Sequence, residues 1–266
     1  MQEDPSAQEG GWRKSYAHVF ELPALGCAWE FIRRNAKICD AWSALKPAWQ
    51  EQTGDHALRI VRAEKSLASP YLWTSSADED ATMASVIWNP ALTDRVLDVV
   101  ALPPKAGFGG QVLDLEFVAA EKTLFVSSDG AQQLLLREGM RSLQLNITGE
   151  NITDPVALFV DTAASEDQLE LQTRLLECFR KLRIGGTLPT DCFPPHPYAR
   201  RAAPVLMALD GHLAGVPHRQ IAIAMFGEER VARDWSDPGE HMRDAVRRAI
   251  ARGLALMEGG YRMFLR

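Results

Sequence analysis

Residues 216–235, VPHRQIAIAMFGEERVARDW, and residues 237–253, DPGEHMRDAVRRAIARG, decide how the C-terminal part of this chain folds. The first stretch predicts a helix that begins after Pro217 and ends at Gly227, followed by a short helical piece up to Trp235. The second stretch predicts a longer helix, for which Asp237 and Glu240 form a capping pair around Pro238. Its apolar side chains cluster on one face at helical spacing: Met242, Ala245, Val246, Ala249 and Ile250.

The longer helix carries four arginines on its remaining arc: Arg243, Arg247, Arg248 and Arg252. The planar guanidinium group binds phosphate, or the O6 and N7 edge of guanine, through two parallel hydrogen bonds. The pattern therefore favours a DNA-binding helix-turn-helix in which this helix is the recognition helix. His218 and Arg219, at the start of the preceding supporting helix, are expected beside the DNA backbone.

A second interpretation of this arc remains open. Asp244 lies among the arginines and Glu240 precedes them, so the charges also fit a solvated face held by ion pairs. Upstream, residues 199–213 predict one more helix. Downstream, either a hairpin turns at Gly259 and Gly260 like the wing of a winged helix, or the long helix continues to Glu258.

Charge is distributed unevenly along the 266 residues, whose formal net charge is −6. Residues 196–266 hold 11 arginines, no lysine and 8 acidic side chains, a net charge of +3. The rest of the chain therefore carries −9, from 18 basic and 27 acidic side chains. A basic end on an acidic body suits a module that meets a polyanion.

The remaining composition narrows the class of protein. No apolar run is long enough to span a bilayer, and the polar, acidic start MQEDPSAQEGG is not a signal peptide, so we expect a cytoplasmic location without a membrane partner. The chain has no phosphate loop, GxSxG, HExxH or paired carboxylate motif, which disfavours an enzyme. We expect no cofactor and no metal, because the cysteines are scattered: Cys27, Cys39, Cys178 and Cys192.

The N-terminal part predicts a polar disordered tail over residues 1–15 and a helical domain over residues 16–68. Trp29, Trp42 and Trp49 have two interpretations. They fill the core of a small helical unit, or they anchor a partner protein together with Arg33 and Arg34.

Residues 69–184 predict a β-rich domain, because short apolar runs alternate with turn residues. We expect a small antiparallel sheet between about residues 70 and 162, in which QVLDLEFV, residues 111–118, is a strand with one wet face. A helix with an apolar stripe closes this domain near Arg183. Residues 185–197, GGTLPTDCFPPHP, form a stiff linker to a DNA-binding domain over residues 198–266. The fold class is therefore α+β.

Several blocks of the C-terminal part occur in an order that resembles a known family. ALDGHLAG, HRQIAIAMFG, VARDW, RDAVRRAIARG and MEGGYRMFL are similar to the RovC-type DNA-binding domain of proteobacterial transcription regulators, a helix-turn-helix variant. YAHVFELPALGCAWEFIRRN resembles the regulator-like domain that often precedes it. Relatives include activators of type VI secretion genes and of excision and transfer genes on integrative and conjugative elements. Many relatives place a small hydroxyl residue where Pro217 stands here.

Two functions follow as hypotheses. The first is a sequence-specific transcriptional activator that binds a promoter repeat in double-stranded DNA as a homo-oligomer, since one short helix reads too few base pairs for useful specificity. Its acidic body would contact RNA polymerase, and the family resemblance also implies an antiactivator protein as a partner. The alternative is an antiactivator or adaptor that binds a regulator protein through its tryptophan-rich N-terminal part instead of binding DNA.

Overall fold

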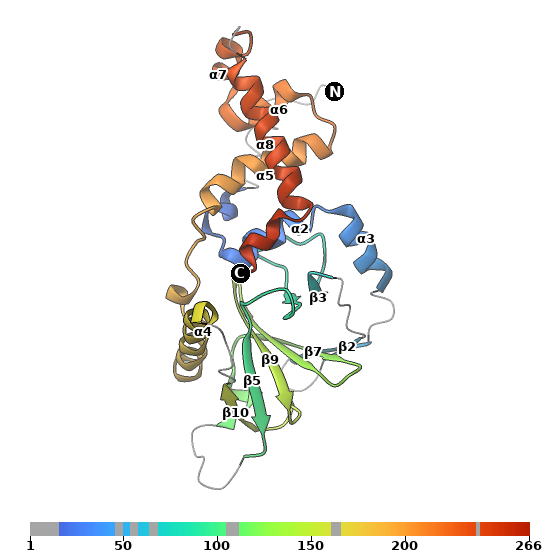
Figure 1. The fold of residues 1–266 in the computed structure, drawn as a ribbon, viewed down its shortest axis with the longest axis vertical. Helices are drawn as coiled ribbons and strands as arrows, with labels where there is room; N and C mark the ends of the chain where they lie inside the picture. Colours follow the sequence, from blue (N-terminus) through green and yellow to red (C-terminus); the bar gives the residue numbers. More distant parts are fainter. Residues whose placement is uncertain are drawn as a thin grey trace, which may run out of the picture. The chain divides into compact units, whose positions relative to one another are not determined.

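The computed structural model describes residues 16–45, 50–53, 58–63, 69–104, 112–160, 166–237 and 240–266. These form two compact units (Figure 1). Unit 1 joins the described residues up to Asn35 with Pro195–Phe264, and unit 2 comprises Ala36–Pro194 with Leu265–Arg266. The first division falls between Asn35 and Ala36, inside the predicted domain 16–68, and the second falls inside the predicted linker. The predicted tail 1–15 and Trp49 lie outside the described residues.

Unit 2 is built around an eight-stranded sheet with the strand order β1-β2-β7-β8-β9-β5-β10-β6. Two of its pairs, β2 with β7 and β5 with β9, are parallel, and the others are antiparallel. A separate two-stranded sheet consists of β3 (Tyr71–Thr74) and β4 (Val86–Trp88). The strands of the large sheet are β1 (Gln50–Thr53), β2 (Leu58–Ala63), β5 (Leu97–Leu102), β6 (Val112–Leu113), β7 (Glu121–Ser127), β8 (Gln132–Glu138), β9 (Arg141–Gly149) and β10 (Val156–Val160).

The large sheet corrects the prediction of a small antiparallel one, while the α+β class is confirmed. Strands β1 and β2 come from a segment that the sequence assigned to the helical domain. β2 then pairs in parallel with β7, with Ile60 opposite Leu124. The predicted strand over residues 111–118 is wrong beyond Leu113. There the side chain of Asp114 accepts a hydrogen bond from the backbone N–H of Glu116 at 2.9 Å, which caps a 3-10 helix, η4 (Leu115–Phe117).

Both faces of the central strands are buried. On β8, Leu134 and Leu136 enter one apolar cluster, while Leu135 enters another with Trp73 and Phe125. Burial on both faces explains why this strand is a continuous run of buried residues without alternation.

The second face also holds a polar ladder across three strands. Gln144 receives a hydrogen bond from the backbone N–H of Trp88 at 2.8 Å and donates one to Gln133 at 2.9 Å. Asn146 donates to Asp98 at 2.6 Å. These bonds satisfy buried polar groups and fix the register of the strands.

Helices complete unit 2. The predicted closing helix is present as α4 (Glu166–Gly185), and Cys178, Phe179 and Leu182 pack from it into the sheet core. The unit also contains α3 (Ala36–Leu45) and a 3-10 helix, η5 (Thr190–Cys192). No described helix is long and apolar enough to cross a membrane.

Unit 1 combines an N-terminal segment with the C-terminal helices. The segment consists of a 3-10 helix, η1 (Ala17–Glu21), and α2 (Ala24–Ile32). The C-terminal elements are α5 (Ala199–Leu213), α6 (His218–Phe226), α7 (Glu228–Asp234), α8 (His241–Met257) and the 3-10 helix η6 (Gly260–Phe264). The predicted helices of this region are therefore present.

The start of α8 differs from the prediction, whereas its end agrees with the alternative in which the helix continues to about Glu258. The helix begins at His241 with Glu240 as its N-cap residue, and no side chain makes a capping hydrogen bond there. It continues to Met257 and is followed by the 3-10 helix η6, so the wing alternative is wrong. α8 lies against α5, where a Cβ atom on Gly253 would stand 2.9 Å from the Cβ atom of Leu209. This position therefore requires glycine for close helix packing.

The N-terminal segment belongs to the core of unit 1. The backbone N–H of His196 donates to the carbonyl oxygen of Leu22 at 2.8 Å, and the Asn35 side chain donates to the carbonyl oxygen of Met257 at 3.1 Å. The rings of Phe31 and Phe264 stack with their centroids 6.2 Å apart. Segments from opposite ends of the chain therefore share one core.

Candidate nucleic-acid interface

Helices α6, α7 and α8 form a helix-turn-helix scaffold. Gly227 alone separates α6 from α7, and its φ of +85° is a conformation that glycine adopts without steric cost. One apolar cluster joins the three helices to α5: Ala208, Ile221, Ala222, Val231, Met242, Val246 and Ile250. The predicted inward face of α8 is thus buried, which leaves its arginines on the outside.

The first two arginines of α8 are held by carboxylates. Arg243 lies 3.0 Å from a Glu240 carboxylate oxygen, and its guanidinium carbon lies 5.6 Å from the ring centroid of Trp235. Arg247 lies 3.5 Å from Glu240 and 2.8 Å from Asp244. All four charged side chains in these pairs remain between 36% and 53% exposed, so the pairs are accessible to water.

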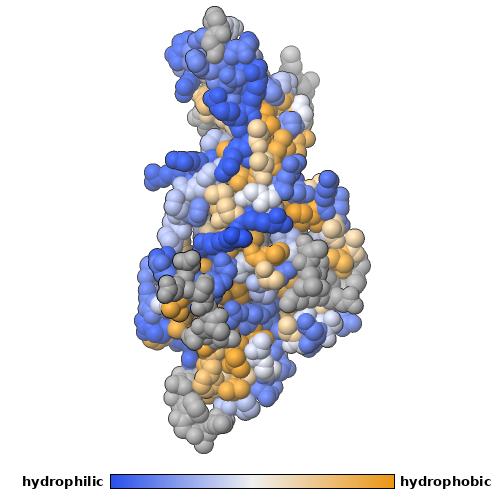
Figure 2. Space-filling model, viewed as in Figure 1, coloured by the Kyte–Doolittle hydropathy of each residue, from blue (hydrophilic) through white to orange (hydrophobic). Residues whose placement is uncertain are grey.

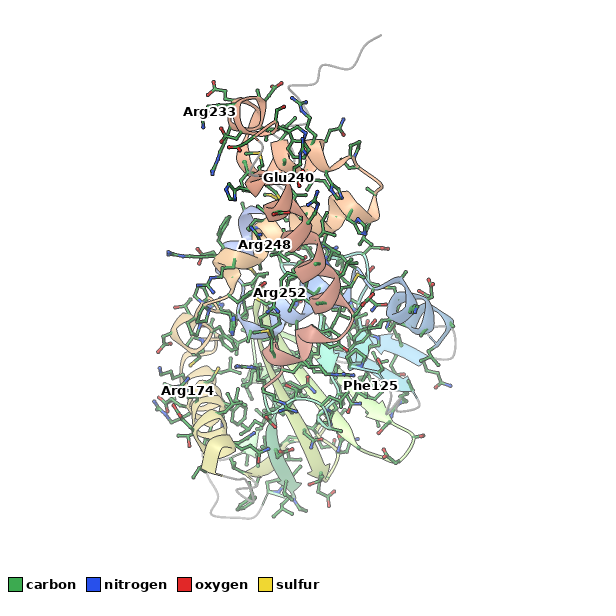
Figure 3. The ribbon with its side chains drawn as sticks, turned by 45° about the horizontal axis from the view of Figure 1, so that its top comes forward. Phe125, Arg174, Arg233, Glu240, Arg248 and Arg252 are labelled. Atoms are coloured by element: carbon green, nitrogen blue, oxygen red, sulfur yellow. The ribbon has the colours of Figure 1, made fainter. Side chains whose placement is uncertain are left out.

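The other two arginines differ from these and from each other. Arg248 is exposed and makes no hydrogen bond or ion pair with the part of the chain that the structure describes. Arg252 lies over the ring of Tyr198 at 5.6 Å and donates to its hydroxyl oxygen at 3.4 Å. Figure 3 shows Arg248 and Arg252 following one another along α8, with Glu240 at the start of the helix. The surface over α7 and the first half of α8 is largely hydrophilic (Figure 2).

His218 and Arg219 are exposed at the start of α6, as the sequence predicts for residues beside a DNA backbone. Within the described chain they make no hydrogen bond or ion pair with the α8 arginines, so they form a separate part of the scaffold surface. Contact of either group with DNA stays a prediction.

Two arginines on α7 were missed by the sequence analysis. Arg230 and Arg233 have side chains that are 60% and 73% exposed, and each pairs with Asp234, at 3.8 Å and 2.9 Å. Arg230 also lies over the Phe226 ring at 5.4 Å. Their spacing of three residues on a short helix was the available signal. The sequence analysis identified this segment only as a short helical piece up to Trp235.

The predicted partner-binding residues lie inside the protein. Trp29 is 2% exposed and Trp42 is 8% exposed, so these tryptophans fill cores, one of the two interpretations left open by the sequence. Arg33 and Arg34 have side chains that are only 19% and 9% exposed. Burial therefore removes Trp29, Trp42 and Arg34 as an exposed docking surface.

Arg34 occupies the centre of a buried charge cluster in unit 1. It donates to a Glu30 carboxylate oxygen at 2.7 Å and to both carboxylate oxygens of Asp210, at 2.5 and 2.8 Å. His18 lies 3.3 Å and Arg33 lies 2.9 Å from Glu30, while the Tyr16 hydroxyl donates to Asp210. We call Tyr16, His18, Glu30, Arg33, Arg34 and Asp210 the buried charge cluster.

Burial and charge compete for the pKa of Glu30. Burial raises this pKa, but the hydrogen bond with His18 and the charges of Arg33 and Arg34 outweigh it, so the pKa lies far below its ordinary value. For Arg34, burial lowers the pKa, but its bonds to Asp210 and Glu30 raise it above the ordinary value. Both groups are therefore charged at neutral pH, and the cluster links α2 to α5.

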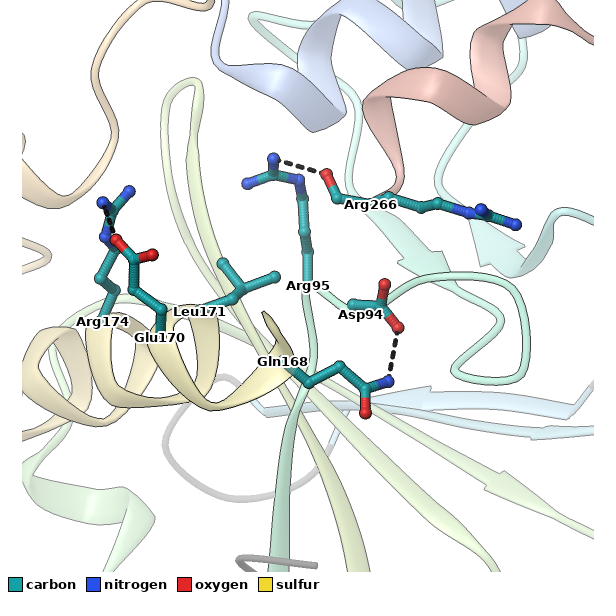
Figure 4. Close-up of a pocket in the computed structure, with 7 residues that line it drawn as sticks. All are labelled: Asp94, Arg95, Gln168, Glu170, Leu171, Arg174 and Arg266. Carbon is teal, nitrogen blue, oxygen red and sulfur yellow. Dashed lines mark hydrogen bonds and ion pairs between the residues drawn. The ribbon is translucent and has the colours of Figure 1, made fainter. Parts of the chain in front are cut away.

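A surface pocket in unit 2 contains none of the predicted site residues (Figure 4). It measures about 570 Å³ and lies between the start of α4 and the segment before β5. Its polar side chains are largely paired within it. Arg174 contacts Glu170 at 2.6 Å, Gln168 donates to Asp94 at 3.1 Å, and Arg95 donates to the carbonyl oxygen of Arg266 at 2.8 Å.

Comparison with known proteins bears on the C-terminal part of the chain. No curated protein matches the sequence. Residues 160–266 match the family model of the RovC DNA-binding domain, described as a type VI secretion transcription factor DNA-binding domain. The match begins upstream of the predicted boundary at residue 198 and includes α4 as well as α5 to α8. This similarity supports a DNA-binding regulator of transcription whose partner is DNA.

Proposed function

We propose that this chain is a sequence-specific transcriptional activator that contacts DNA through the arginine face of α8. The observation that carries the proposal is the family match, because residues 160–266 include the whole helix-turn-helix scaffold. On that scaffold, the apolar face of α8 is buried and the arginines point outward. Phosphates and guanine edges are the ligands for which an exposed row of guanidinium groups is suited.

Each arginine has a role in this proposal. Arg247 and Arg248 lie near the middle of the helix and contact phosphates or base edges. Arg243 and Arg252 flank them, while His218 and Arg219 contact the DNA backbone from α6. Arg230 and Arg233 on α7 add exposed positive charge to the same scaffold.

We extend the proposal to the target genes, location, oligomeric state and protein partners. The targets are secretion genes or the excision and transfer genes of a mobile element, as the family resemblance implies. The protein acts in the cytoplasm as a homo-oligomer, with RNA polymerase and an antiactivator as further partners. The adaptor alternative is weakened, because two of the tryptophans that would dock a regulator protein, Trp29 and Trp42, are buried.

The direct test is a double substitution, Arg247→Ala with Arg248→Ala, in the full chain. DNA that the wild-type protein selects from a random pool is used as the probe in gel-shift and anisotropy measurements. We expect binding to fall at least about 30-fold, since two well-placed guanidinium contacts at about 1–3 kcal/mol each sum to at least about 2 kcal/mol. The far-ultraviolet circular dichroism and the melting temperature should stay close to those of the wild type, because both side chains are exposed.

The matched control is Arg174→Ala with Arg180→Ala. These arginines are also exposed, and each pairs with a glutamate as Arg247 does, but they lie on α4 in unit 2. The control removes the same charge and should retain most of the affinity. Equal binding by wild type and the α8 double variant would refute the recognition-helix assignment.

A further inference from the structure

Glu240 has an unusual backbone conformation for a glutamate. Its φ of 51° and ψ of 12° lie in the left-handed region, and among the described residues it is the one non-glycine residue with positive φ. A side chain with a Cβ atom is strained there, and glycine or asparagine is the usual occupant. Residues in such conformations cluster at functional sites, where the strain serves a local arrangement.

The local arrangement here involves the two carboxylate oxygens of Glu240. One lies 3.0 Å from Arg243 and the other lies 3.5 Å from Arg247, so a single side chain reaches both arginines. Asp244 also pairs with Arg247, at 2.8 Å. A carboxylate in this position occupies the same guanidinium edges that a DNA phosphate would use.

The Glu240 pairs are weak enough to exchange. The side chains of Glu240, Arg243 and Arg247 are 45%, 36% and 53% exposed, and ion pairs at such exposure contribute little to stability. This exposure distinguishes them from the pairs of Glu30, whose side chain is fully buried. An incoming phosphate can therefore displace Glu240, at the cost of separating both pairs.

We propose that Glu240 competes with DNA phosphates for Arg243 and Arg247. The proposal rests on the proposed function, since it concerns the same arginine face. Random DNA offers mainly phosphate contacts, and these gain less when a carboxylate must first be displaced. Glu240 therefore weakens binding to DNA of random sequence.

The test measures binding of the full chain to a 30-base-pair duplex of random sequence by fluorescence anisotropy over a series of salt concentrations. Glu240→Gln removes the charge while keeping the length of the side chain. We expect this variant to bind the random duplex about 5-fold more tightly at low salt, because Arg243 becomes available to phosphates and Arg247 keeps only Asp244 as a carboxylate partner. The plot of log K against log salt concentration should steepen by up to about 2, since each new phosphate contact adds about 0.9.

A double-mutant cycle separates competition from the general loss of a negative charge. In the background of Arg243→Ala with Arg247→Ala, the Glu240→Gln substitution should change affinity less than about 2-fold. Glu228→Gln is the matched control, because Glu228 is exposed on α7 and the described chain shows no ion pair for it. Glu240→Gly is a second variant. Because glycine adopts the left-handed conformation without strain, this variant keeps the proposal testable even if Glu240→Gln misfolds.

The outcomes are distinguishable. Tighter binding by both Glu240 variants, absent in the double-alanine background, supports the proposal. If the wild type binds DNA and Glu240→Gln behaves like Glu228→Gln, the competition is refuted while the proposed function stands. If neither the wild type nor any folded variant binds DNA at the lowest salt concentration, the proposed function fails, and the competition fails with it.

Discussion

Unit 1 contains two clusters of arginine and carboxylate side chains that share their chemistry and differ in burial. In the buried charge cluster, the side chains of Glu30 and Arg34 are 0% and 9% exposed. In the cluster at the start of α8, Glu240 and Arg247 are 45% and 53% exposed. Both clusters place one carboxylate between two arginines. They differ in how far water reaches the charged groups, so comparing them shows how solvent exposure changes such ion pairs.

Burial determines which of these ion pairs can exchange partners. A buried arginine that loses its carboxylate becomes an unpaired charge at low dielectric constant, which is strongly unfavourable. An exposed arginine that loses its carboxylate is solvated at once, so little is lost. The buried charge cluster is therefore a permanent link between α2 and α5, while the exposed pairs of the α8 cluster can exchange a carboxylate for a phosphate.

The largest expected effect comes from breaking the buried cluster. Arg34→Ala leaves the buried carboxylate of Glu30 and the partly buried carboxylate of Asp210 without their shared partner. We expect the free energy of unfolding to fall by about 3–5 kcal/mol. Urea denaturation followed by circular dichroism measures this loss. Arg33→Ala removes a single, more exposed arginine from Glu30 and should cost clearly less. A loss below 1 kcal/mol for Arg34→Ala would contradict the conclusion that the buried charge cluster is a permanent link between α2 and α5.

A smaller loss of stability is expected on acidification, because mildly acidic pH protonates only a fraction of Glu30 in the folded protein. Its pKa is lower in the folded state than in the unfolded state, where it is about 4.3. The stabilisation is therefore complete above about pH 4.3 and is lost progressively as the pH falls toward the folded-state pKa. Urea unfolding at pH 7, 5, 4 and 3 measures the loss. Glu30→Gln should make the free energy of unfolding depend less on pH in this range. If this variant loses stability with falling pH as steeply as the wild type, Glu30 is not the cause.

The smallest effect is expected at the exposed cluster. Asp244→Asn removes the closest partner of Arg247, at 2.8 Å, yet we expect the free energy of unfolding to change by less than about 1 kcal/mol. The same urea experiment measures it, with Glu258→Gln, an exposed acid beyond the end of α8, as the control. A cost above 2 kcal/mol would show that the α8 pairs are structural and would remove the contrast between the two clusters.

Local patterns in the sequence predicted the C-terminal helices well. Met242, Val246 and Ile250 fix the inward face of α8 by their spacing, so the outward position of its arginines follows from helix geometry. The closing helix α4 was predicted for the same reason. Gly227 was recognised as a break, because a glycine between two helical patterns is a local signal.

Long-range pairing was beyond these patterns. Strand β1 is exposed at every position, so it has no hydrophobic signal, and it exists because it pairs with β2. Arg34 was considered only as a contact for a partner protein, since nothing near it in the sequence reveals Asp210 as its partner. The pairing of the α8 arginines with Asp244 and Glu240 was one of the two interpretations left open by the sequence, and the structure contains these pairs. The left-handed backbone conformation of Glu240 was missed, because the sequence suggested a capped helix beginning at Pro238.

The assembly of unit 1 from both ends of the chain has a consequence for biosynthesis. Glu30 and Arg34 leave the ribosome long before Asp210, which lies on α5 and is translated after residues 36–194 of unit 2. At ordinary rates of bacterial or eukaryotic translation the delay is roughly 10–35 seconds. Unit 2 is nearly continuous in sequence and can fold during this interval, whereas unit 1 closes last. A polypeptide interrupted before α5 therefore cannot complete unit 1, and it lacks helices α5 to α8, which lie in the part of the chain that matches the DNA-binding family model.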